Sequence, residues 1–80
     1  MELKWRKTSY NSWQLWWDEQ VLRCAELTPR NGWWSLTLSH NVAPLNFNPD
    51  RARFGTFEDA QEYTENLVRL LIIGGHHGRN

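Results

Sequence analysis

The sequence predicts an α+β fold, in which a three- or four-stranded antiparallel meander is covered on one face by a single C-terminal helix. Three observations lead to this prediction. Residues 57–73 carry apolar side chains at spacings of three and four, residues 33–39 alternate apolar and polar side chains, and residues 29–32 form a strong turn signal. Because 80 residues can close around only one apolar core, residues 1–80 are expected to form a single domain.

The clearest element is the helix. Thr56 is expected to cap its N-terminus, with Asp59 three residues on as in a capping box, and Gly74-Gly75 is expected to end it. We therefore place the helix at about 57–73 and a mobile tail at 74–80. The predicted apolar stripe consists of Phe57, Ala60, Tyr63, Thr64, Leu67, Leu70 and Leu71.

Four segments are expected to form strands. The sequence does not decide which side chains of the third strand face the core. If Ala25 faces the core, the alternation of the strand also buries Arg23. If Cys24 faces the core, it buries Glu26 instead. The predicted strands lie at about 3–8, 12–17, 21–27 and 33–39.

Two segments are open to more than one interpretation. Residues 13–27 are expected to form a hairpin. A helix is the alternative, because the apolar residues of this segment also fit a helical spacing. Residues 41–55, which contain two prolines and several asparagines, are expected to form a long loop. The sequence does not define the course of residues 41–53.

Six tryptophans are the most unusual feature of the composition. Adjacent residues of a strand point to opposite faces, so the pairs Trp16-Trp17 and Trp33-Trp34 must each be divided between two faces. The alternation assigns Trp17 and Trp34 to the core under the helix, and leaves Trp16 and Trp33 among polar side chains. A polar face with two tryptophans is a candidate binding surface, unless another segment of the chain covers it.

Composition and spacing indicate no enzyme, metal site or cofactor. Nine basic residues balance nine acidic ones, so the net charge is unlike that of a typical nucleic-acid binder. The single cysteine, Cys24, is expected to be a buried thiol, and the three histidines do not form a convergent ligand set. No apolar run is long enough to span a membrane and no signal-peptide pattern is present, so a cytoplasmic location without membrane contact is expected.

One local run resembles a DNA-binding family. The run from Arg53 to Tyr63, with Gly55-Thr56-Phe57 at its centre, resembles the last strand and the start of the helix in AP2 and phage integrase-arm domains. Those domains are three-stranded sheets backed by one helix, and the resemblance implies that Arg and Trp side chains on the strands contact DNA. Arg23 and Arg53 are the plausible contacts of this kind in the sequence.

The whole layout resembles another group. A Trp-rich meander followed by the run Gly55-Thr56-Phe57-Glu58-Asp59-Ala60 is similar to small phage and prophage β-meander-plus-helix proteins, a group that includes anti-CRISPR inhibitors. This resemblance implies a stoichiometric inhibitor that blocks a host nucleoprotein complex, such as a bacterial CRISPR effector complex, in the host cytoplasm.

We therefore expect a non-enzymatic protein-interaction module. Trp16 and Trp33 are expected to anchor the partner, with Arg23, Arg51 and Arg53 at the rim of the contact. The alternative is a DNA- or single-stranded nucleic-acid-binding domain that uses the same face. The same face is also a candidate interface for a homodimer. The identity of the partner and the oligomeric state are not defined by the sequence.

Overall fold

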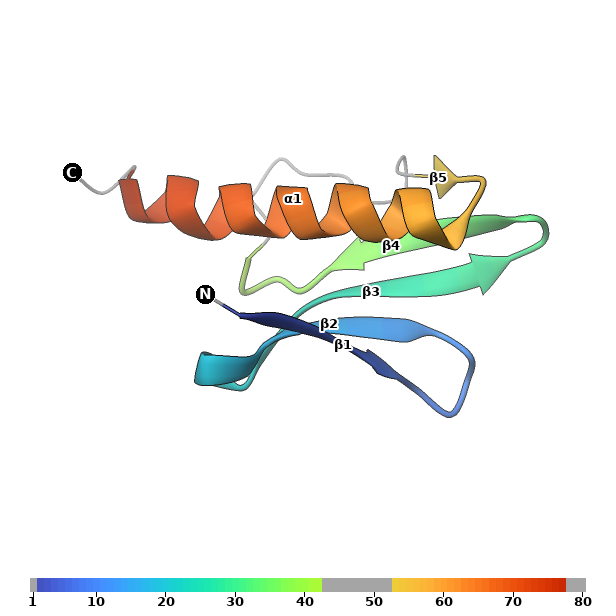
Figure 1. Cartoon of the computed structure of the whole chain (residues 1–80), viewed down its shortest axis with the longest axis horizontal. Helices are drawn as coiled ribbons and strands as arrows, with labels where there is room; N and C mark the ends of the chain where they lie inside the picture. The colour runs from blue at the N-terminus through green and yellow to red at the C-terminus, as the bar shows by residue number, and fades with distance from the viewer. Residues whose placement is uncertain (1, 43–52, 78–80) are drawn as a thin grey trace.

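The computed structural model describes residues 2–42 and 53–77, with only the backbone described for 74–77 (Figure 1). Within these residues, an antiparallel sheet has the strand order β1-β2-β3-β4-β5, and a helix packs on one of its faces. The predicted α+β meander with one C-terminal helix is confirmed. The elements are β1 (Leu3–Lys7), β2 (Trp13–Trp17), the 3-10 helix η1 (Asp18–Gln20), β3 (Leu22–Arg30), β4 (Trp33–Leu38), β5 (Arg53–Phe54) and α1 (Phe57–His77).

The segment from residue 13 to residue 27 is a hairpin, not a helix. β2 and β3 pair antiparallel, and η1 connects them. The chain leaves η1 through Val21, whose φ of 48° and ψ of 47° are left-handed. This conformation is unfavourable for a β-branched residue, but it reverses the chain so that β3 can return beside β2.

A β-bulge decides which side chains of β3 face the core. Leu15 pairs with Ala25, whereas Trp16 pairs with Arg23, so Cys24 is an extra residue on the β3 side. Cys24 and Ala25 are consequently both buried, while Arg23 is exposed. Neither of the two predicted frames was correct, because each assumed an uninterrupted alternation.

The turn between β3 and β4 is shorter than predicted. Residues 29 and 30 belong to β3, which continues to Arg30, and the turn consists of Asn31 and Gly32. Gly32 has a φ of 77°, which a side chain would disfavour. On the far side of β4, β5 occupies two residues of the predicted loop 41–55; residues 43–52 lie outside the described part of the chain.

The helix begins as predicted but ends later. The Asp59 backbone N–H donates a 3.2 Å hydrogen bond to Thr56 Oγ1, which confirms Thr56 as the N-terminal cap. α1 continues through Gly74 and Gly75 to His77, so the predicted end at residue 73 is wrong. A glycine inside a helix costs only about 1 kcal/mol relative to alanine and does not by itself stop the helix.

The buried side of α1 differs in part from the predicted stripe. Ala60, Thr64 and Val68 are completely buried and lie four residues apart on one face. Tyr63 and Leu70 were expected on this face, but they are 46% and 68% exposed. They are seven residues apart and therefore share a less covered side of the helix, where the Tyr63 ring centroid lies 5.0 Å from that of Phe54 on β5.

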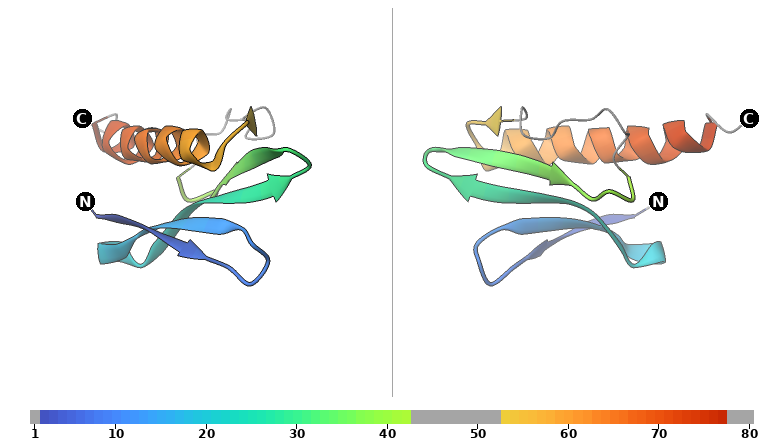
Figure 2. Two further views of the ribbon diagram at one scale, coloured as in Figure 1. Left: turned by 45° about the vertical axis from the view of Figure 1, so that its right-hand side comes forward. Right: turned by 180° about the vertical axis from the view of Figure 1, so that it is seen from behind.

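The core lies between α1 and one face of the sheet (Figure 2). Phe57, in the first turn of α1, joins the two layers through its contacts with three tryptophan rings. The centroids of Trp5, Trp13 and Trp34 lie 6.0, 5.4 and 5.0 Å from that of Phe57. The buried apolar residues are Leu15, Cys24, Ala25, Leu27, Leu36, Leu38, Ala60 and Val68.

Candidate binding face of the sheet

The face of the sheet turned away from α1 is called the open face below (Figure 2). Residues paired directly across neighbouring antiparallel strands point to the same side of a sheet, so the strand register defines its members. In the described residues, the open face consists of the cross-strand rows Lys4–Trp16–Arg23, Arg6–Gln14–Glu26–Thr37, Thr28–Ser35–Arg53 and Arg30–Trp33.

The two tryptophan pairs are divided between the faces. Trp17 and Trp34 pack against the core, whereas Trp16 and Trp33 lie half-buried on the open face. Their partners are therefore different in kind. The Trp34 ring meets Phe57, while Trp16 Nε1 donates a 3.1 Å hydrogen bond to Gln14 Oε1 of its own strand.

Each tryptophan of the open face lies under an arginine. Arg6 Cζ is 5.1 Å from the centroid of the Trp16 ring, and Arg53 Cζ is 4.5 Å from that of Trp33. In both pairs the arginine comes from the adjacent strand and is diagonal to the tryptophan in the register. These contacts are cation–π interactions, worth about 0.5–1 kcal/mol at exposed sites.

The structure places four of the five predicted site residues on one face in two groups: Trp16 and Arg23 lie beside one end of β3, and Trp33 and Arg53 lie beside the other end. Trp16 on β2, Arg23 on β3, Trp33 on β4 and Arg53 on β5 all belong to the open face. Arg51 lies outside the described residues. The four residues come from different strands, so the sheet rather than one continuous segment assembles the site.

Three basic residues of the open face were missed by the sequence reasoning. Lys4 and Arg6 alternate with the core-directed Leu3 and Trp5 along β1, a period-two signal that was present but not used. Arg30 was assigned to a turn, whereas it is the last residue of β3 and pairs with Trp33.

The open face is positively charged although the chain is neutral. Asp18 accepts ion pairs from Lys4 at 3.5 Å and from Arg6 at 3.1 Å. Glu26 is the acidic residue within the rows. The basic residues are Lys4, Arg6, Arg23, Arg30 and Arg53, so five positive and two negative groups leave an excess of three positive charges on this side.

The acidic residues of α1 balance this excess on the opposite side of the molecule. Glu58, Asp59 and Glu62 are all exposed on the helix. The net charge of zero therefore conceals two oppositely charged sides. A charge separation of this kind orients a molecule in the field of a charged partner.

Glu26 is held in place by hydrogen bonds. Ser12 Oγ donates to one carboxylate oxygen at 2.7 Å, and Gln14 Nε2 donates to the other at 3.3 Å. These bonds satisfy the half-buried carboxylate without a cation. These two donors are neutral, so they leave the charge of Glu26 in place. Glu26 is thus a negative charge among the basic residues of the open face.

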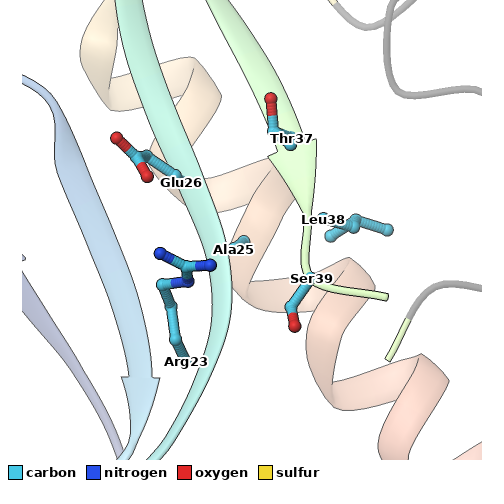
Figure 3. A pocket seen from close by; sticks show the side chains of 6 residues that line it. All are labelled: Arg23, Ala25, Glu26, Thr37, Leu38 and Ser39. Carbon is cyan, nitrogen blue, oxygen red and sulfur yellow. The ribbon is translucent and has the colours of Figure 1, made fainter. Parts of the chain in front are cut away.

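A shallow hollow lies between β3 and β4 (Figure 3). It measures about 50 Å³. Pockets for small-molecule ligands usually measure about 300–1,000 Å³, so this hollow is too small to bind such a ligand. Its lining residues are Arg23, Ala25, Glu26, Thr37, Leu38 and Ser39.

Cys24, the single cysteine of the chain, is completely buried. Burial raises the pKa of the Cys24 thiol, and a backbone hydrogen bond from Trp17 opposes this effect more weakly. Cys24 Sγ donates to the Leu22 carbonyl oxygen at 3.6 Å. Among residues 2–42 and 53–77, no group of three or more His, Cys, Asp and Glu side chains could hold a metal ion.

The described residues contain no helix with the length and apolar character needed to cross a membrane. No family model, curated protein or solved structure matches the chain.

Proposed function

We propose that this chain is a non-enzymatic binding module, which attaches through its open face to the negatively charged surface of a macromolecular partner. The observation that carries the proposal is the pairing of each half-buried tryptophan with an arginine, Trp16 with Arg6 and Trp33 with Arg53, on a face with excess positive charge. The hollow between β3 and β4 is too small for a small-molecule ligand. The open face is therefore better suited to an extended contact with a macromolecule than to binding a small molecule.

Tryptophan and arginine suit such a contact for physical reasons. Both are enriched among the residues that contribute most to binding energy in protein interfaces. A tryptophan ring offers a large and rigid contact area, and a guanidinium group offers several hydrogen-bond donors in a fixed plane. Arg53, held over Trp33, already occupies a restricted position and loses less side-chain entropy when it binds.

The charge of the open face restricts the partner. The sequence predicts a protein partner, which for a phage-encoded inhibitor would be a host nucleoprotein complex such as a CRISPR effector complex in the cytoplasm; nucleic acid is the alternative. Either partner must offer negative charge to Arg23, Arg30 and Arg53. A homodimer through the open face is disfavoured, because it would oppose two positively charged surfaces.

The proposal is tested by affinity capture from a bacterial lysate with the tagged chain, with and without nuclease treatment. Trp33→Ala and Arg53→Ala change the open face, and Glu62→Gln changes the exposed side of α1 as a matched control. We expect the first two variants to lose the captured partner and the control to retain it, since Glu62 lies on the other side of the molecule.

Folding of every variant is checked by circular dichroism and thermal unfolding. Equal capture by the wild type and by folded Trp33→Ala and Arg53→Ala variants would contradict the proposal. Loss of capture in Glu62→Gln alone would assign binding to the helix instead.

A further inference from the structure

We infer that the negatively charged partner is a nucleic acid, which the open face contacts mainly through the phosphate backbone. This inference rests on the proposed function and names its partner. An acidic protein surface is the other class of partner, and the experiment below distinguishes the two.

The basic residues are spread across the width of the sheet. Lys4 and Arg6 lie on β1 at one edge of the sheet and Arg53 lies on β5 at the other, with Arg23 and Arg30 between them on β3. Neighbouring strands are about 4.8 Å apart, so four strand spacings separate the outer cations by roughly 19 Å. That distance exceeds the width of about 12 Å of the DNA major groove, so cations at the two edges can reach phosphates on both sides of a groove.

Two arginines of the open face, Arg30 and Arg53, are held by contacts within the sheet. Guanidinium groups bind phosphate oxygens through paired N–H donors. Arg53 Cζ lies 4.5 Å from the centroid of the Trp33 ring, and Arg30 Nε donates to Ser35 Oγ at 3.3 Å. Neither contact uses the terminal N–H groups as hydrogen-bond donors, so these contacts leave those groups for a ligand. Thr37 adds an exposed hydroxyl, a type of group that contacts phosphates in protein–DNA complexes.

The two tryptophan rings of the open face are already in contact with arginines. Proteins that bind single-stranded nucleic acids stack the bases on exposed aromatic rings. Here a cation already lies over each ring of the open face, Arg6 over Trp16 and Arg53 over Trp33. Base stacking on these faces would have to displace the arginines, so phosphate contact is favoured and a duplex should bind at least as well as a single strand.

The exposed acidic residues of α1 lie on the side of the molecule opposite the open face. Glu58, Asp59 and Glu62 on α1 are repelled by a polyanion, while the open face is attracted to it. The chain therefore approaches a nucleic acid with the helix pointing away. An overall charge of zero does not prevent this approach, because the two sides of the sheet differ in sign.

The test is a fluorescence anisotropy titration of the full chain against labelled oligonucleotides of mixed sequence. The probes are duplex DNA, duplex RNA and single-stranded DNA of about 20 nucleotides, each measured at several salt concentrations between about 50 and 200 mM. We expect duplex binding that weakens with salt, with a slope of log K against log salt of about −2 to −4, since each phosphate contact contributes roughly −0.9.

Three variants locate the contact. Arg30→Ala and Arg53→Ala should each weaken duplex binding about 3- to 10-fold and reduce the salt slope by about 1. Glu26→Gln keeps an acceptor for Ser12 but removes the negative charge, so it should strengthen duplex binding about 2- to 5-fold by the same electrostatic term. Glu62→Gln, on the exposed side of α1, should change binding by less than about twofold.

The outcomes separate this inference from the proposed function. If no oligonucleotide binds at the lowest salt, but a nuclease-resistant partner is captured in a manner that depends on Trp33 and Arg53, the partner is a protein and only the inference fails. Oligonucleotide binding that is insensitive to Arg30→Ala and Arg53→Ala also overturns the inference. Tighter binding of the single strand by more than about tenfold would overturn the phosphate-contact geometry and indicate base stacking.

Discussion

The indole N–H of Trp5 donates a 2.6 Å hydrogen bond to Glu65 Oε2, which joins the edge strand β1 to the middle of α1 across 60 residues of sequence. Arg69, one turn later, lies 3.6 Å from the other oxygen of the same carboxylate. β1 carries Lys4 and Arg6, so this bond also fixes the edge of the open face relative to the helix.

Removing this donor should destabilise the fold. Trp5→Phe keeps an aromatic ring against Phe57 but leaves the half-buried Glu65 without the indole donor. We expect the free energy of unfolding to fall by about 1–3 kcal/mol. Urea titration followed by circular dichroism measures it, and a double-mutant cycle with Glu65→Ala isolates the coupling between the two side chains. A coupling energy near zero would show that the bond contributes no net stability.

The adjacent tryptophans Trp33 and Trp34 should respond differently to truncation. Trp34→Ala removes a ring that packs on Phe57 at 5.0 Å and should cost about 3–5 kcal/mol, enough to unfold much of a small domain. Trp33→Ala removes a ring of the open face and should cost about 1 kcal/mol or less, mainly the contact with Arg53. Thermal unfolding of both variants checks this order; the reverse order would show that the two faces are assigned wrongly.

Val21 offers a stabilising substitution. Its φ of 48° is disfavoured for a β-branched residue, and its side chain is 71% exposed, so no packing depends on it. Val21→Asn should raise the free energy of unfolding by about 1 kcal/mol, which for a domain of this size raises Tm by about 4–8 °C. Val21→Ile keeps the β-branch and serves as the control, with little change expected. An unchanged Tm for Val21→Asn would contradict the strain argument.

Cys24 should make the stability of the fold fall in alkaline solution. Burial raises the pKa of its thiol in the folded state. As the pH rises above about 8.5, the thiol of the unfolded chain loses its proton first. The free energy of unfolding therefore decreases with pH until the thiol of the folded chain also ionises. The stability that depends on the neutral thiol is therefore fully present below that pH and declines above it.

Cys24→Ala removes this titration. The variant loses stability at neutral pH because it creates a small cavity, but its Tm should decline less than that of the wild type between about pH 8 and 10. Differential scanning fluorimetry across this range measures both curves. Parallel curves would show that the thiol does not contribute to the alkaline loss.

Local signals predicted the elements whose formation depends on nearby residues. The Thr56 cap and the start of α1 were predicted because the hydrogen bond to Asp59 spans only three residues. The division of Trp16 from Trp17 and of Trp33 from Trp34 was predicted because alternation is a property of extended backbone itself. Alternation was enough to place Trp16 and Trp33 on the face opposite the helix.

Other features depend on which residues meet across the fold. The bulge at Cys24 arises because β3 must keep both Cys24 and Ala25 against the helix while Arg23 and Glu26 stay outside, a choice that alternation alone could not express. The end of α1 was placed too early, since glycine weakens a helix without obliging it to stop.

The amino-acid sequence by itself determined the fold class, favoured a hairpin over a helix for residues 13–27, and assigned each paired tryptophan to a face, because these follow from backbone geometry and the period of apolar residues. Only the tertiary structure decided the charge of the open face. Lys4, Arg6 and Arg30 join Arg23 and Arg53 there through strand pairing, whereas the acidic residues of α1 lie on the opposite side. A net charge is a sum over the chain, but a partner meets one surface, and the register of the sheet decides which charges that surface carries.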